Sequence, residues 1–206
     1  MFPTLHLGPV SLPTPGLLFL AGIWLGMLLA ERLAPRYQVD GKTISDLIFV
    51  GLIAGIIGAR LAYAVQSYQA FLDNPLAVLS PTPDLLDPIG GTIIAAITML
   101  VYGQRKNIAL RPTLDALTPF LAVMGIALGL SHLASGNAYG VPTQLPWGIP
   151  LWGTRRHPTQ IYEILANVLI LWAIWPQKDS TENEEGKIFA RFLALTAGAY
   201  LIILGF

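Results

Sequence analysis

The stretch GTRRHPTQIYE combines two arginines, a histidine and a glutamate immediately before a long apolar run. Arg155 and Arg156 can each hold a phosphate through a forked pair of N–H donors, which a lysine cannot do. Pro158 suits the first turn of a helix, so a helix is expected to begin beside these arginines. The N-terminal amides of a helix also attract anions. Residue types and spacing therefore indicate a site for an anion such as a phosphate.

The same stretch also fits a second interpretation, a belt of residues that anchors a helix at a membrane surface. In such a belt arginines extend to the lipid headgroups, and aromatic side chains such as Trp147 and Tyr162 lie at the interface. Gln160 and Glu163 are spaced to share one face of the helix. The residues alone leave the anion site and the anchor belt equally open.

Other polar residues stand inside or beside apolar runs. Arg60 lies in GIIGARLAYAV, where a central arginine costs roughly 2.5 to 3.5 kcal/mol. We expect Arg60 either to reach the headgroups from a helix end or to turn inward toward a lipid phosphate or a buried carboxylate. His132 lies at the end of a later apolar run. We expect it to serve either as a hydrogen-bonded structural group or as a proton-transfer group. Asn137 and Tyr139 follow in SGNAYGVPT, a predicted loop in which they either contact a headgroup or close the turn.

The composition indicates where these residues must lie. The 206 residues are 54% hydrophobic and only 12% charged, whereas soluble domains are roughly a quarter charged. Too few polar side chains are present to cover a globule in water, so we predict an integral membrane protein. The zero net charge argues against nucleic acid as a partner. The absence of cysteine excludes disulfides and thiolate sites, and we predict no cofactor and no metal.

Six apolar stretches approach the length of about 20 residues that a helix needs to cross a bilayer. We predict one all-α, polytopic domain over residues 1–206 with about six transmembrane helices. The third stretch, IGGTIIAAITMLVYG, is short, so it either begins as early as Leu85 or is partly re-entrant. The expected spans cover residues 16–33, 47–65, 89–103, 114–134, 161–175 and 188–206.

Basic residues occur in alternate connections between these spans, and such connections stay on the cytoplasmic side. The predicted cytoplasmic set is Arg32, Arg36, Lys42, Arg105, Lys106, Arg111, Lys178, Lys187 and Arg191. Both termini are then expected on the outer side. Arg155 and Arg156 also fall on that outer side, against the general trend, which favours a local role for this pair.

Several segments, in order, resemble the prolipoprotein diacylglyceryl transferase family. RHPTQIYE resembles its RHPxQLYE signature, GLIAGIIGARLAYAV its glycine–arginine helix, IGGTI its glycine pair, and GNAYGVPT a glycine-containing loop. The resemblance covers nearly the whole chain. It implies an all-helical enzyme of the inner membrane that moves diacylglycerol from phosphatidylglycerol onto the lipobox cysteine of a preprotein and releases glycerol phosphate.

The resemblance also implies roles by position. Arg156 would hold the lipid phosphate, with Arg60 inside the same cavity. The residues expected to shape the site are His157, Gln160, Tyr162, Glu163, Asn137, Tyr139, Gly90, Gly91 and Gly140. The implied partners are a phospholipid, expected to be phosphatidylglycerol, and either a lipobox preprotein or a membrane complex.

The chain departs from the family pattern at several expected catalytic positions. Pro15 replaces a tyrosine, Ile89 replaces the proposed base before the glycine pair, and Gly129 replaces an arginine. His132 falls where the family has an asparagine, and it becomes the candidate catalytic base.

Three functions follow from this pattern. The first is a divergent diacylglyceryl transferase. The second is a relative without catalysis that keeps the lipid cavity, as a lipid-binding or accessory subunit of a membrane complex. The third is a small transporter, which would need several buried charges along a path, whereas Arg60 is the clear candidate within a span.

Overall fold

The computed structural model describes five parts of the chain, which fall into two compact units. The described parts are residues 4–7, 10–69, 85–151, 153–175 and 185–206. Unit 1 comprises Met1–Gly41 and Arg111–Phe206, and unit 2 comprises Lys42–Leu110. A single domain over the whole chain stays a prediction, and each unit has internal packing of its own.

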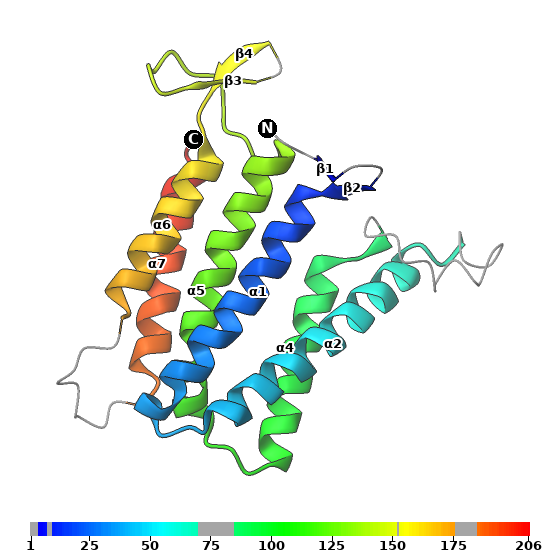
Figure 1. Ribbon diagram of the computed structural model, residues 1–206, viewed down its shortest axis with the longest axis vertical. Coiled ribbons are helices and arrows are strands. Elements are labelled where there is room, and N and C mark those ends of the chain that lie inside the picture. The colour runs from blue at the N-terminus through cyan, green and yellow to red at the C-terminus, as the bar shows by residue number, and fades with distance from the viewer. Residues whose placement is uncertain (1–3, 8–9, 70–84, 152, 176–184) are drawn as a thin grey trace. The chain divides into compact units, whose positions relative to one another are not determined.

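Within its described residues, unit 1 contains four helices, a short 3-10 helix and two hairpins, whose arrangement is drawn in Figure 1. The helical elements are α1 (Thr14–Leu33), η1 (Ala34–Tyr37), α5 (Leu110–Ser135), α6 (Thr159–Ala173) and α7 (Lys187–Ile203). The strands are β1 (Thr4–Leu7), β2 (Val10–Pro13), β3 (Ile149–Leu151) and β4 (Thr154–Arg156). Both hairpins are antiparallel, β1 with β2 and β3 with β4.

Helix α5 packs against α1 on one side and α6 on another through glycines. A side chain at Gly22 would collide with Ala127, and one at Gly26 would meet Phe120. A side chain at Gly129 would in the same way meet Ile164 of α6. Small residues at such contacts let two helix backbones approach closely. Glycine therefore sets how near α1 and α6 lie to α5.

Helix α7 is fixed at its start by a carboxylate from α5. The Asp115 carboxylate accepts hydrogen bonds from the backbone N–H groups of Gly186, at 2.6 Å, and Phe189, at 2.8 Å. These N–H groups have no partner within the helix, and the Asp115 carboxylate supplies one. Its negative charge also interacts favourably with the positive N-terminal end of the helix dipole. Further along, an apolar cluster joins α5, α6 and α7, formed by Ala122, Ile170, Ile174 and Phe192.

Unit 2 contains α2 (Gly41–Gln66) and α4 (Pro88–Arg105), which pack mainly through apolar and small residues. A side chain at Gly58 would meet Ile94, and one at Gly91 would meet Ala59. Helix α4 is one continuous helix of 18 residues. It begins at Pro88, after Leu85, and whether the third apolar stretch crosses the membrane fully stays a prediction.

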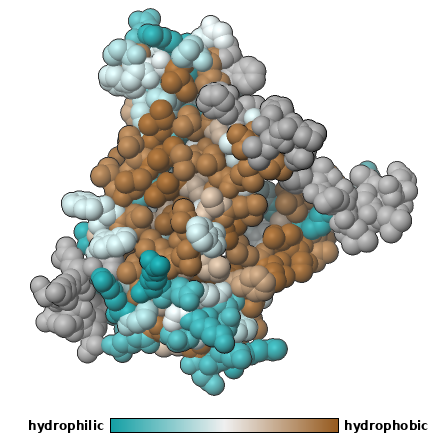
Figure 2. All heavy atoms as spheres, in the orientation of Figure 1, coloured by the Kyte–Doolittle hydropathy of each residue, from teal (hydrophilic) through white to brown (hydrophobic). Residues whose placement is uncertain are grey.

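The exposed surface of these helices is apolar. On the face shown in Figure 2, hydrophobic side chains cover the middle of the helices and hydrophilic ones gather toward their ends. Trp172 of α6 is 78% exposed and Leu201 of α7 is 73% exposed. Large exposed apolar areas mark contact with lipid or with another protein. Within the described residues, three helical stretches are long and apolar enough to cross a membrane: Thr14–Tyr37, Gly41–Gln66 and Leu110–Ser135.

The structure confirms the predicted all-α, polytopic membrane class. Every predicted span overlaps a helix, and α1, α2, α4 and α5 extend beyond the predicted limits at one or both ends. Helices α6 and α7 begin slightly earlier than predicted and end at Ala173 and Ile203, before the predicted limits. The two hairpins were not predicted, because strands of three or four residues are too short to show an alternating pattern. The connection after α2 and the one that contains Lys178 lie largely outside the described residues.

Unit 1 has one basic end and one mixed polar end. Arg111 lies near Gly186 at the basic end, because a side chain at Gly186 would be 3.7 Å from Arg111 Cβ. At this end α5 and α7 begin and α1 ends close to Arg36. Arg155 and Arg156 lie at the other end, in the β3–β4 hairpin (Figure 1). This separation follows the charge alternation of the sequence. The side of the membrane on which each end lies stays a prediction.

Candidate functional site

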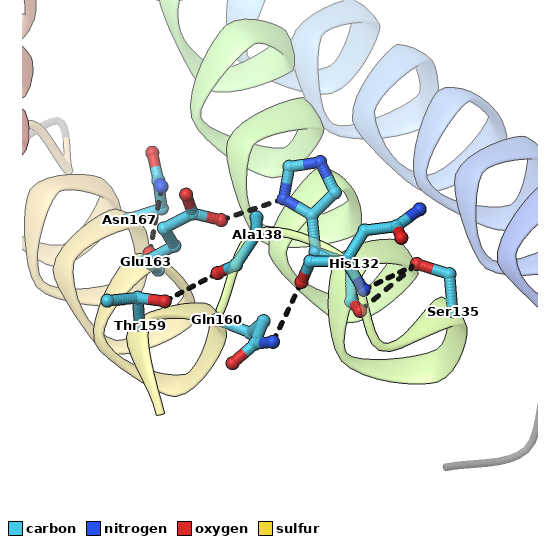
Figure 3. A network of polar contacts seen from close by, with 8 residues as sticks. His132, Ser135, Ala138, Thr159, Gln160, Glu163 and Asn167 are labelled. Carbon is cyan, nitrogen blue, oxygen red and sulfur yellow. Dashed lines mark hydrogen bonds and ion pairs between the residues drawn. The ribbon is translucent and has the colours of Figure 1, made fainter. Parts of the chain in front are cut away.

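The loop after α5 is tied to the first turn of α6. Thr159 donates a hydrogen bond from its hydroxyl to the carbonyl of Ala138, and Gln160 donates from Nε2 to the carbonyl of Asn137 at 2.7 Å. Figure 3 shows both contacts bridging the two segments. Buried backbone carbonyls need donors, and α6 supplies them from its polar first turn. This explains why polar residues precede the apolar part of α6.

The loop takes a tight path that only certain residues allow. Ala138 has a positive φ of 51°, and Gly136 has one of 78°. A side chain at Gly140 would lie 2.7 Å from Cβ of His157 and 2.9 Å from Thr159. The predicted site residue Gly140 therefore lets the loop pass close against the start of α6.

A histidine and a glutamate meet between α5 and α6. Nδ1 of His132 lies 3.0 Å from Oε2 of Glu163. Asn167, one turn further along α6, donates from Nδ2 to the Glu163 carbonyl at 2.8 Å. Figure 3 shows the imidazole turned toward the carboxylate. A carboxylate in this position orients an imidazole through the hydrogen bond between them.

Arg156 is held in one orientation by the loop. Its guanidinium lies over the Tyr139 ring, 4.9 Å from the ring centroid, and Nη1 donates to the carbonyl of Gly140 at 3.4 Å. Its Nε is buried and has no hydrogen-bond partner among the described residues. Arg155 precedes it on β4, where successive side chains point to opposite faces, and it is exposed. The two arginines are therefore not equivalent.

Four aromatic rings form a cluster at the same end of unit 1 as Arg156. The Tyr162 hydroxyl accepts a hydrogen bond from Nε1 of Trp147 at 2.8 Å and lies 3.2 Å from Nδ1 of His157. The Phe206 ring lies 5.0 Å from the His157 ring, centroid to centroid. These rings border a largely apolar cavity of about 360 Å³ that is lined by Leu145, Trp147, His157, Tyr162 and Phe206.

The structure thus brings nine of the predicted site residues together in unit 1. They are His132, Asn137, Tyr139, Gly140, Arg156, His157, Gln160, Tyr162 and Glu163. Their chemical roles stay predictions. Among the described residues, no group of three or more His, Cys, Asp and Glu side chains is arranged to hold a metal ion.

The other three predicted site residues lie in unit 2. Arg60 is 9% exposed and donates from Nη1 to the carbonyl of Leu85 at 2.9 Å. Its guanidinium is therefore held inside the protein instead of extending to the headgroups. Gly90 and Gly91 lie against Ala62 and Ala59, where they allow α4 to approach α2 closely.

The structure shows the surroundings of the three positions that depart from the family pattern. Ile89 is 73% exposed at the start of α4, and Pro15 lies in the first turn of α1. Gly129 is buried against α6, where a side chain would lie 2.8 Å from Ile164 Cγ1 and 3.3 Å from the Gln160 carbonyl. An arginine has no room at this contact. Glycine at position 129 therefore allows α5 and α6 to pack closely.

Sequence reasoning missed Asn167 as part of the polar network. Asn167 is 2% exposed, although it lies within the run ILANVLILWAIW. A polar side chain inside a spanning helix is costly unless it finds a partner. The single amide in this run was the signal that could have identified it.

The fold and the polar network define a polytopic helical membrane protein with a charged site at one end of a helix bundle. The profile of the prolipoprotein diacylglyceryl transferase family matches residues 3–205. The chain belongs to this family. The match covers both units and every segment on which the resemblance was based.

Individual relatives agree with this assignment. A phosphatidylglycerol–prolipoprotein diacylglyceryl transferase of Finegoldia magna is 31% identical over 181 residues, which cover 87% of this chain and 73% of the relative. One of Synechococcus elongatus is 32% identical over 186 residues, covering 84% of this chain and 64% of the relative. One of Bordetella parapertussis is 28% identical over 211 residues, covering 98% and 80%.

Proposed function

We propose that the protein transfers a diacylglyceryl group from phosphatidylglycerol to the cysteine thiol of a prolipoprotein at the inner membrane. Family membership supports this reaction, as do the names of the relatives, which specify both substrates. The apolar exposed surface of the helices suits a protein whose lipid substrate arrives from the bilayer.

The observation that carries the proposal is the restrained guanidinium of Arg156. As sulfur bonds to the glycerol carbon, the bond from that carbon to the phosphate oxygen breaks and negative charge builds on the leaving glycerol phosphate. A donor that is already oriented stabilises this charge without reorganisation during the step. The Tyr139 ring and the Gly140 carbonyl supply that orientation.

The remaining predicted residues have supporting roles in this proposal. Thr159 and Gln160 hold the loop that carries Tyr139, and the Tyr162–His157 cluster offers an apolar wall for lipid or peptide. Arg60 lies in unit 2, and its predicted role as a phosphate ligand stays a prediction. The site end of unit 1 is opposite its basic end, so by the positive-inside rule the site faces outward, where exported preproteins arrive.

The test compares two adjacent arginines in full-length protein reconstituted in phosphatidylglycerol vesicles. A peptide with a lipobox cysteine is added, and the thioether product is measured by mass spectrometry. Arg156→Ala should lower the rate by about 10²- to 10³-fold. Arg155→Ala, on the exposed face of the same strand, should keep nearly the wild-type rate.

Two results would contradict the proposal. Wild-type protein that yields no thioether product but still binds phosphatidylglycerol would indicate a lipid-binding relative without catalysis. Equal, small effects of Arg155→Ala and Arg156→Ala would instead support the membrane-anchor interpretation of this segment.

A further inference from the structure

We propose that His132 accepts the proton of the substrate thiol and that Glu163 positions it for this task. The inference rests on the proposed transfer reaction and assigns the base that this reaction needs. The family position for the base is Ile89, whose hydrocarbon side chain can neither accept nor donate a proton. The reaction therefore needs another acceptor, and the α5–α6 contact contains an imidazole paired with a carboxylate.

The hydrogen bond between the two residues defines which nitrogen can accept a proton. An ionised carboxylate only accepts hydrogen bonds, so Nδ1 of His132 carries its proton toward Oε2 of Glu163, 3.0 Å away. Nε2 then has the free lone pair. Figure 3 shows this nitrogen on the edge of the ring that faces away from Glu163. None of the described residues hydrogen-bonds to it.

The exposed fractions of the His132 and Glu163 side chains indicate different roles for the two residues. The His132 side chain is 28% exposed and the Glu163 side chain is 10% exposed. The imidazole can therefore meet a substrate, whereas the carboxylate acts on the substrate only through the imidazole. His132 is the catalytic residue in this proposal and Glu163 is a positioning residue.

The surroundings keep the carboxylate in place. Asn167 donates a hydrogen bond to the Glu163 carbonyl from the next turn of α6. Gly129, one turn before His132 on α5, leaves no side chain to separate the two helices. Helix α1, on the other side of α5, has its charged residues Glu31 and Arg32 near its far end. Among the described side chains, Glu163 is thus the charged group that faces the imidazole.

The step balances with the groups available. The S–H bond of the lipobox cysteine breaks as its proton passes to Nε2, and sulfur forms a bond to the glycerol carbon. The bond between that carbon and the phosphate oxygen breaks with its electron pair, which leaves with glycerol phosphate. The imidazolium, stabilised by Glu163, then returns its proton to the released phosphate. No oxidant, reductant or other reactant is required.

The first experiment measures the transfer rate of His132→Ala in phosphatidylglycerol vesicles with a lipobox peptide. Removing a general base lowers a rate by about 10²- to 10⁴-fold. Binding of phosphatidylglycerol should stay unchanged, and added imidazole should restore part of the rate by supplying the missing acceptor. The recovery by imidazole identifies a proton-transfer role, because a packing defect would not respond to it.

The second experiment tests Glu163 as a positioning residue. Glu163→Gln keeps the size of the side chain, so kcat should fall about 10-fold or more while KM for phosphatidylglycerol stays the same. The double variant His132→Ala, Glu163→Gln should be no slower than His132→Ala, because Glu163 acts only through the imidazole. Glu31→Gln, the same change at the far end of α1, should have the wild-type rate.

The possible outcomes test the assignment of His132 as the base separately from the proposed transfer reaction. Wild-type protein without product would overturn the proposed function, and this inference with it. Wild-type product together with an unaffected His132→Ala would overturn the His132 assignment alone. Loss of phosphatidylglycerol binding in His132→Ala without recovery by imidazole would show a structural role and overturn it too. Losses that multiply in the double variant would overturn the positioning role of Glu163.

Discussion

The contact between α5 and α6 and the contact between α2 and α4 both depend on glycine, but the glycines face different chemistry. In unit 2, Gly58 faces Ile94, and Gly91 faces Ala59 and the backbone carbonyl of Gly55, so these two glycines face hydrocarbon and backbone and no polar side chain. In unit 1, Gly125 faces the side-chain amide of Asn167, and Gly129 faces the Gln160 carbonyl as well as Ile164.

The difference shows two uses of a small residue in a membrane protein. Between α2 and α4, close approach increases van der Waals contact, which is the main attraction between helices in lipid. Between α5 and α6, it makes room for buried polar side chains that must reach their partners at hydrogen-bond distance. Buried polar groups are costly when unpaired, so the α5–α6 contact tolerates less change in its geometry.

The largest expected effect comes from placing an arginine at Gly129, the residue that the family pattern has there. Its Cβ would lie 2.8 Å from Ile164 and force α6 away from α5. Overpacking together with an unpaired buried charge should lower the free energy of unfolding by more than about 3 kcal/mol. Chemical denaturation in detergent micelles measures this change.

Gly103→Arg is the matched control in unit 2. A side chain at Gly103 meets nothing within 4 Å, and the position lies next to Arg105 and Lys106 near the end of α4. The long arginine side chain can reach the polar surface from there. If Gly129→Arg were as stable as Gly103→Arg, the account of Gly129 as a closed contact would be wrong.

The helices could be predicted from the sequence because membrane spans depend on local properties. A run of about 20 apolar residues specifies a helix in lipid wherever its partners lie. Pro158 likewise indicated the start of α6, which begins at Thr159. These features need no knowledge of distant residues.

The site could be predicted only in part, because its contacts join distant segments. RHPTQIYE identified Arg156 and Glu163, yet the partner of Glu163 is His132, 31 positions away. Nothing near His132 in the sequence specifies which helix packs against it. The restraint of Arg156 by the Gly140 carbonyl depends in the same way on a loop 16 positions earlier.

A smaller effect is expected for Gly91→Ala in unit 2. The added methyl would lie 2.8 Å from both Ala59 Cβ and the backbone carbonyl of Gly55, and the carbonyl cannot move independently of its helix. The free energy of unfolding should fall by about 1–3 kcal/mol. Gly103→Ala on the same helix should instead raise it by about 0.5–1 kcal/mol, because alanine favours helix and the site is open. Equal effects of the two changes, measured by denaturation in micelles, would contradict close α2–α4 packing at Gly91.

The smallest expected effect concerns the start of α4. This helix is capped by Asp87, the residue that directly precedes it, whereas the start of α7 in unit 1 is capped by Asp115 from α5. The Asp87 carboxylate accepts from the N–H groups of Ile89 and Gly90, at 3.2 and 3.1 Å, and from Gln66. Asp87→Ala removes this cap and should lower the free energy of unfolding by about 1 kcal/mol. Asp87→Asn keeps an oxygen acceptor and should retain most of the stability. If asparagine were as damaging as alanine in the same denaturation experiment, the charge of Asp87, and not its capping geometry, would be what stabilises α4.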